Sequence, residues 1–109
     1  MRKAPIGELE QLVLLAVLRL GSNAYTVAIR EEIALLAERR LSRGAIYVTL
    51  ERLERKGLLE SYFGEPSRER GGKAKKFFRP RPEAIRALEQ SQRALQAMWE
   101  GIDLAGEQR

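Results

Sequence analysis

The sequence contains no cysteine and no histidine, and only 6% of its residues are aromatic. Without cysteine the chain cannot form disulfides, thiolate metal sites or a cysteine nucleophile, and a reducing cytoplasm is its expected compartment. Without histidine it lacks the commonest general base and the commonest metal ligand. Because no other catalytic set of residues is evident, the sequence predicts a protein that is not an enzyme and that carries no metal or other cofactor.

Long hydrophobic runs are also absent, since the longest, Leu12 to Leu18, has seven residues. A helix that crosses a membrane needs about 20 consecutive apolar residues, so no membrane association is expected. With 109 residues, of which 44% are hydrophobic, the chain can bury the core of one modest domain. The apolar residues fall into periodic runs, which predicts a helix-rich fold.

Positive charge is concentrated in one part of the chain. Residues 42–81 contain eleven Lys or Arg and five Glu, a net charge of +6, whereas the rest of the chain carries −1. A polyanion is the natural partner for such a segment, because each neutralised phosphate releases condensed counterions. The alternative is a solvated face that only keeps the protein soluble.

The spacing of apolar residues predicts three helices in the first part of the chain. The first covers residues 8–20, is apolar nearly all round and therefore needs partners on two sides. The second covers residues 25–39 and is amphipathic. The third covers residues 43–56, between Ser42, which suits an N-cap, and Gly57, which suits a left-handed C-cap.

A β-hairpin is predicted next, with strands at residues 58–63 and 75–79 and a long basic tip that contains glycine. Within the tip, Gly72-Lys73 is similar to the end of a phosphate-binding P-loop. That motif requires Ser or Thr after the lysine and glycine five residues before Gly72, where this chain has Ala74 and Ser67. A nucleotide site of this kind is therefore excluded.

A fourth helix is predicted from Pro82, which suits a first helical turn. Its stripe, at spacings of three and four, consists of Ile85, Leu88, Gln92, Leu95, Trp99 and Ile102. A helix after the hairpin has little domain core left to meet, so we expect it to pair with a second copy, with Leu14 and Leu18 of the first helix as further contacts. The alternative is packing within its own domain. Trp99 could anchor this seam, or two such indoles could flank a small aromatic ligand.

The order helix, helix, N-capped helix, basic hairpin, long helix is that of a winged helix-turn-helix. The predicted fold is mostly α (α+β), with a DNA-binding domain at residues 1–79 and a C-terminal dimerisation helix and tail at residues 80–109. In such domains the third helix enters the major groove of double-stranded DNA, while the hairpin lies along the backbone.

Part of the third helix points away from its buried stripe or flanks it. Gly44, Val48, Glu51 and Arg55 point away from the stripe, and Arg43, Tyr47 and Arg52 lie on its flanks. Arg43 could bind guanine or phosphate, and Ser42 could donate to a phosphate. Gly44 would let the DNA approach closely, although glycine in a first turn also costs little. Tyr47 could equally be a structural residue of its own domain.

Several stretches strongly resemble PadR-family transcriptional regulators. They are GELEQLVLL at residues 7–15, the Ala24-Tyr25 pair, SRGAIYVTLERLERKGLL at residues 42–59 and GEPSRERGGKAKKFF at residues 64–78. The resemblance covers about residues 6–100. It implies a homodimeric, DNA-binding repressor, in a family whose members respond to phenolic acids, drugs or other small molecules, or have no known ligand. The short C-terminal part is similar to the subgroup that has one dimerisation helix.

The resemblance also implies positions for the DNA contacts. It places Ser42, Arg43, Gly44, Tyr47, Val48 and Arg52 on the recognition helix, Tyr25 and Thr26 near the DNA backbone, and Arg70, Gly72, Lys73, Lys75 and Lys76 on the wing. Thr26 stands where the family usually has glycine, and Phe77-Phe78 where tyrosines are common. The sequence thus favours a cytoplasmic dimeric repressor that a small aromatic effector releases. The alternative is a winged-helix protein–protein adaptor that does not read DNA sequence.

Overall fold

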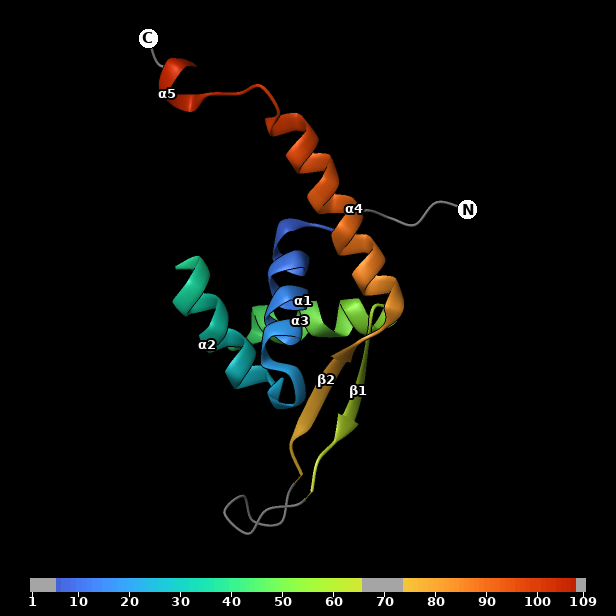
Figure 1. Cartoon of the computed structure of the whole chain (residues 1–109). Helices are drawn as coiled ribbons and strands as arrows, with labels where there is room; N and C mark the ends of the chain where they lie inside the picture. Colours follow the sequence, from blue (N-terminus) through green and yellow to red (C-terminus); the bar gives the residue numbers. More distant parts are fainter. Residues whose placement is uncertain (1–5, 66–73, 108–109) are drawn as a thin grey trace.

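A computed structural model describes residues 6–65 and 74–107 of the chain (Figure 1). Its elements are α1 (Glu8–Leu20), the short 3-10 helix η1 (Gly21–Asn23), α2 (Thr26–Ala37), α3 (Arg43–Arg55), β1 (Leu59–Phe63), β2 (Lys76–Pro80), α4 (Pro82–Trp99) and α5 (Leu104–Glu107). The four predicted helices and both strands are confirmed. The hairpin and α4 leave the block formed by α1, α2 and α3 in opposite directions (Figure 1).

Helices α1, α2 and α3 enclose the core. Its largest fully buried side chains include Leu14, Ile29, Ile46 and Leu50. The prediction that Leu14 contacts a second copy is wrong, because Leu14 is 0% exposed. The reason is that α1 packs against α2, α3 and β2 at once, so its buried arc is wider than a single stripe.

The ends of α3 are fixed by the residues that the sequence indicated. At its start, the Ser42 hydroxyl accepts a hydrogen bond from the backbone N–H of Ala45 at 3.0 Å. At its end, Gly57 adopts a φ of +77°, which lets the N–H of Leu58 donate to the carbonyl of Leu53 at 3.0 Å. These caps set which residues of α3 face the core and which face solvent.

The hairpin is joined to the start of α2. Strands β1 and β2 pair antiparallel, in a register from Leu59 opposite Pro80 to Phe63 opposite Lys76. The residues before α2 add a further short pairing to β2, because Tyr25 forms a bridge with Phe77. The wing base and the first turn of α2 therefore form one unit.

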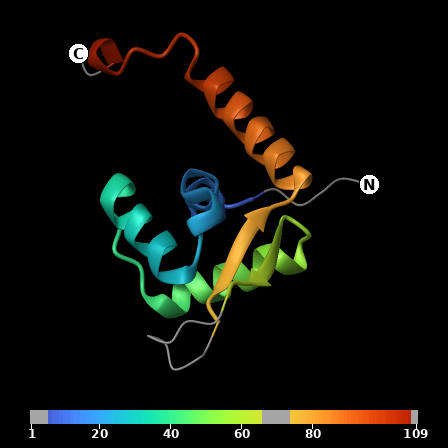
Figure 2. The ribbon, with the colours of Figure 1, turned by 60° about the horizontal axis from the view of Figure 1, so that its bottom comes forward.

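Helix α4 is covered by the domain only over its first half (Figure 2). Ala84 is fully buried, Leu88 packs against the core, and the Ser91 hydroxyl donates to Gln11 Oε1 on α1 at 3.0 Å. Beyond this point the apolar residues Leu95 and Trp99 are 56% and 55% exposed. One continuous apolar stripe thus begins in the core and ends in solvent.

Candidate nucleic-acid interface

The outward face of α3 carries the predicted DNA-contacting residues. Ser42, Arg43, Gly44, Tyr47, Val48 and Arg52 are all exposed, as is Arg55 on the same face. The large side chains of Tyr47 and Val48 are 51% and 46% exposed, so the domain does not use them as core. Arg55 was not among the predicted contacts, although its position seven residues after Val48 places it on the same side of the helix.

The arginines of this face keep their charge available. In the described part of the chain, the side chains of Arg43, Arg52 and Arg55 make no hydrogen bond or ion pair. By contrast, Arg19 pairs with Glu32 at 2.8 Å and Arg39 with Glu8 at 2.8 Å on other surfaces of the domain. Three arginines without an ion pair in the described ranges therefore lie together on α3.

Gly44 is open to solvent within its own domain. A Cβ atom added there would meet only the Ser42 hydroxyl, at 3.9 Å. No positive φ angle occurs at this residue, so neither packing nor backbone conformation requires glycine. The fold does not explain why residue 44 is glycine, whereas the close approach of an external partner would.

The wing base gathers the residues expected near the DNA backbone. The ammonium of Lys75 lies 3.8 Å from the centre of the Tyr25 ring, at the N-cap of α2. Thr26 is the first residue of that helix. Lys76 points elsewhere, since its ammonium is 3.8 Å from the Glu54 carboxylate. The other predicted wing residues, Arg70, Gly72 and Lys73, lie outside the described residues.

Sequence reasoning missed the residues that support Tyr25. The ring of Phe77 meets Tyr25 edge-on at 5.7 Å and stacks on Tyr62 at 5.7 Å. Gly64 makes room for Phe77, because a Cβ at this glycine would lie 2.7 Å from the Phe77 ring. The alternation of β2 places Phe77 opposite Tyr62, but only the register of the hairpin could have indicated this cluster.

The residues predicted for pairing with a second copy are mostly exposed. Leu18, Ile85, Gln92, Leu95, Trp99 and Ile102 are exposed, Leu88 is half-buried and Leu14 is buried. The shallow hollow between α1 and α2, lined by Leu12, Leu15 and Leu36, does not include Trp99.

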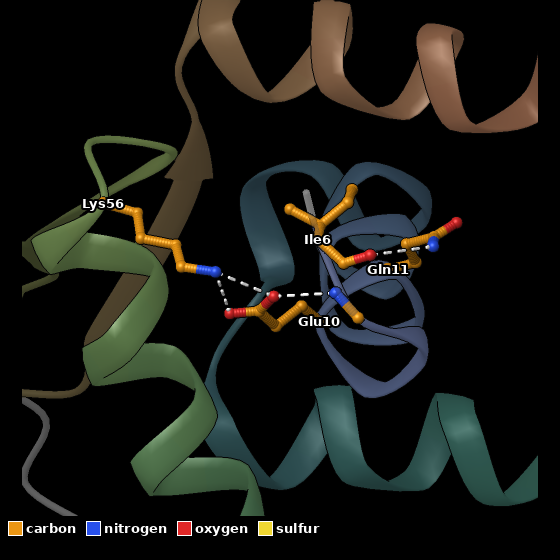
Figure 3. Close-up of polar contacts among 5 residues, drawn as sticks. Ile6, Glu10, Gln11 and Lys56 are labelled. Atoms are coloured by element: carbon orange, nitrogen blue, oxygen red, sulfur yellow. Dashed lines mark hydrogen bonds and ion pairs between the residues drawn. The ribbon is translucent and has the colours of Figure 1, made fainter. Parts of the chain in front are cut away.

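Glu10 joins α1 to the end of α3 (Figure 3). Its buried carboxylate accepts hydrogen bonds from Lys56 Nζ at 2.8 and 3.0 Å and from the Gly7 N–H at 2.9 Å. Burial by itself would raise the pKa of Glu10, but these hydrogen bonds and the positive charges of Lys56 and Arg52 lower it below its usual value. Lys56 is thus paired within the domain, at the end of α3.

This ion pair predicts a pH-dependent stability. Because the pKa of Glu10 is lowered by folding, its contribution is present above the ordinary value of 4.5 and is lost as the pH falls through the lower folded value. Glu10→Gln should lower the free energy of unfolding at neutral pH by about 1–3 kcal/mol, and this difference should shrink in acid. Urea unfolding across pH measures it. The control is Glu8→Gln, whose carboxylate is exposed, and an equal effect of both variants would contradict the assignment.

Neither a metal site nor a membrane span is found in the part of the chain that the structure covers. No group of three or more acidic side chains is arranged there to hold a metal ion. Of the helices in the described ranges, none is long and apolar enough to cross a membrane.

Three packed helices, a capped helix with an exposed basic face and a two-stranded wing define the winged helix-turn-helix class of DNA-binding domains. Within this class, the model of the transcriptional regulator PadR-like family matches residues 14–81. The chain belongs to this family, and both the resemblance and the fold predicted from the sequence are confirmed. Members of the family are transcriptional regulators and not enzymes.

Solved structures of similar fold include regulators from several organisms. A transcriptional regulator from Clostridium thermocellum has 20% identity and a TM-score of 0.70, over 84% of this chain and 86% of that one. A PadR family regulator from Eggerthella lenta has 27% identity and a TM-score of 0.67, over 86% and 81%. BpsR from Bordetella bronchiseptica, whose DNA binding is regulated by 6-hydroxynicotinic acid, has 16% identity and a TM-score of 0.64, over 96% and 74%. No curated protein matches the chain significantly.

Proposed function

We propose that the protein is a sequence-specific DNA-binding repressor that acts as a homodimer, with α3 of each copy in a major groove. The observation that carries this proposal is the outward face of α3, where the side chains of Arg43 and Arg55 make no hydrogen bond or ion pair with a described residue and Arg52 acts on Glu10 only through its charge. Arginines kept unpaired on a helix that is firmly capped and packed are suited to guanine edges and phosphates.

In this proposal the residues around α3 hold the DNA backbone. Ser42, Thr26 and Lys75 would contact phosphates, together with Arg70, Gly72 and Lys73 of the wing tip, and Tyr25 and Lys76 would lie beside them at the wing base. The support is geometric for Tyr25, Thr26 and Lys75, because they meet at the wing base. Residues 1–79 would form the DNA-binding domain and residues 80–109 the dimerisation segment.

The second half of α4 supports the homodimer. Leu95 and Trp99 are 56% and 55% exposed and continue the stripe that starts at the buried Ala84, whereas Ile102, predicted as part of this stripe, follows the end of the helix and is 49% exposed. An identical stripe on a second copy would cover them in a two-fold contact, with the exposed Leu18 of α1 at its side. The wing and α4 leave the domain in opposite directions (Figure 1). We therefore expect such a pairing to leave α3 of both copies free to meet DNA.

A small aromatic effector is part of the same proposal. Trp99 is 55% exposed near the end of α4, and pairing would bring two indoles to one seam, where they could flank a planar ligand. The regulation of BpsR by 6-hydroxynicotinic acid gives one example of an aromatic acid acting on a protein of similar fold. Release of DNA would follow if the ligand favoured a different angle between the two copies.

The experiment is a gel shift with the DNA upstream of the protein's own gene, repeated with aromatic carboxylic acids while Trp99 fluorescence is followed. The proposal predicts a retarded complex, and a ligand that changes fluorescence should also release the DNA. Binding without any ligand response would remove the effector and leave the repressor. Failure to retard any duplex at low salt, together with capture of another protein through α4, would instead establish the adaptor function.

Gly44→Ala should separate stability from DNA binding. Alanine is favoured over glycine inside a helix by up to about 1 kcal/mol, and the added Cβ meets only the Ser42 hydroxyl at 3.9 Å. The variant should therefore be as stable as the wild type or more stable, and yet bind its operator less tightly because a methyl group now stands between backbone and duplex. Thermal unfolding and a gel shift on the same preparation measure both. Unchanged DNA affinity would show that Gly44 is incidental.

A further inference from the structure

Lys75 is held in an unusual way for a surface lysine. Its side chain lies over the Tyr25 ring, with Nζ 3.8 Å from the ring centre, and the residue is half-buried. A cation at this distance from an aromatic face is attracted by the negative charge of the ring. Its backbone is fixed as well, because the carbonyl of Lys75 accepts a hydrogen bond from the Gly64 N–H at 2.9 Å.

The ring that holds Lys75 is itself fixed on several sides. Tyr25 is bridged to Phe77 through the backbone, and the edge of one ring meets the other at 5.7 Å. Next to this bridge, the backbone N–H of Phe78 donates a hydrogen bond to the carbonyl of Ala24 at 2.9 Å. Tyr25 therefore has little freedom to swing away from the wing.

The adjacent lysine has a different environment. The ammonium of Lys76 lies 3.8 Å from Glu54 on α3 and 5.6 Å from the Phe78 ring. Its charge is therefore partly balanced within the domain. Lys75 makes no ion pair with any residue of the described ranges, so its charge is directed to the start of α2 without a counter-ion there.

We propose that Tyr25 is a positioning residue for Lys75, and that Lys75, rather than Lys76, is the phosphate-binding lysine of the wing base. This inference rests on the proposed DNA binding and deepens it. The ring keeps a long flexible side chain ordered before DNA arrives, so less conformational entropy is lost when the ammonium meets a phosphate. The aromatic ring of Tyr25, and not its hydroxyl, performs this role.

A double-mutant cycle on operator binding tests the proposal. Lys75→Met should reduce the slope of log affinity against log salt by about 1, as expected when one phosphate contact is lost, whereas Lys76→Met should change it less. Tyr25→Leu should weaken binding by nearly as much as Lys75→Met, and adding Lys75→Met to Tyr25→Leu should weaken it little further. Tyr25→Phe keeps the ring and should bind like the wild type.

Tyr62→Leu is the matched control for lost aromatic packing. The Tyr62 ring lies 5.7 Å from the Phe77 ring, the same distance as the Tyr25 ring. Its own face is covered by Arg79 and not by Lys75. In this background Lys75→Met should weaken binding as much as it does in the wild type. If Tyr25→Leu fails to fold, a phenylalanine with a heavily fluorinated ring can be placed at position 25. It keeps the shape of the ring but removes its negative face. It should weaken operator binding by nearly as much as Lys75→Met does.

Three results would overturn the inference. They are independent losses for Tyr25→Leu and Lys75→Met, a loss for Tyr25→Phe as large as that for Tyr25→Leu, and a loss for Lys76→Met larger than that for Lys75→Met. A wild-type protein that binds no duplex would instead overturn the proposed function, and this is seen before any variant is compared.

Discussion

Replacing Arg43 by alanine is expected to lower the affinity for operator DNA roughly tenfold to a hundredfold, as the loss of a bidentate contact to a base does. The affinity for random duplex should fall only severalfold, because it depends on the total positive charge and not on one position. The physical reason is that Arg43 opens α3, is exposed and has no partner among the described residues. Gel shifts with both duplexes at one salt concentration give the two losses.

The control for Arg43→Ala removes the same charge from another surface. Arg39→Ala is suitable because Arg39 already pairs with Glu8 at 2.8 Å. This variant should change both affinities slightly and alike. Equal losses on operator and random DNA for Arg43→Ala would show that Arg43 contributes only charge, and would contradict its role in reading sequence.

Leu95→Asp is expected to convert a dimer into a monomer. The side chain of Leu95 is 56% exposed in the single chain, so the change should leave the fold of the DNA-binding domain intact, while a carboxylate in an apolar seam strongly disfavours pairing. A monomer loses the advantage of two linked recognition helices, and operator affinity should fall by about 10²–10⁴. Sedimentation and gel shifts on one preparation measure both effects.

Ala97→Asp is the matched control for this change. Ala97 is exposed on α4, two residues from Leu95, and therefore faces nearly the opposite direction. It introduces the same charge and should leave both the dimer and the operator affinity unchanged. A Leu95→Asp protein that still sediments as a dimer would show that the second half of α4 is not the seam.

The main features of the fold could be predicted from the sequence because they depend on short-range patterns. The ends of α3 follow from Ser42 and Gly57, which act within a few residues. The contact of Tyr25 with Phe77 could not be predicted, because these residues are far apart in the chain and meet only through the register of the hairpin. The burial of Leu14 was missed for a similar reason, since α1 meets three elements at once.

The candidate site was likewise predictable only in part from the sequence. The outward face of α3 could be read from helical periodicity, and the structure leaves its residues exposed as expected. Which cations remain unpaired could not be read, because this depends on distant partners such as Glu10 for Lys56 and Glu54 for Lys76. Composition shows the excess of positive charge, whereas the tertiary structure decides where that charge is available.

The most direct test of the central claim is selection of bound duplexes from a pool of random sequence, followed by measurement of how many chains each selected duplex binds. The account predicts an inverted repeat whose half-sites are centred about 34 Å apart, one helical turn, with two chains per duplex and enrichment that Arg43→Ala weakens. A pool that stays random after selection, or a selected site that one chain occupies alone, would contradict it.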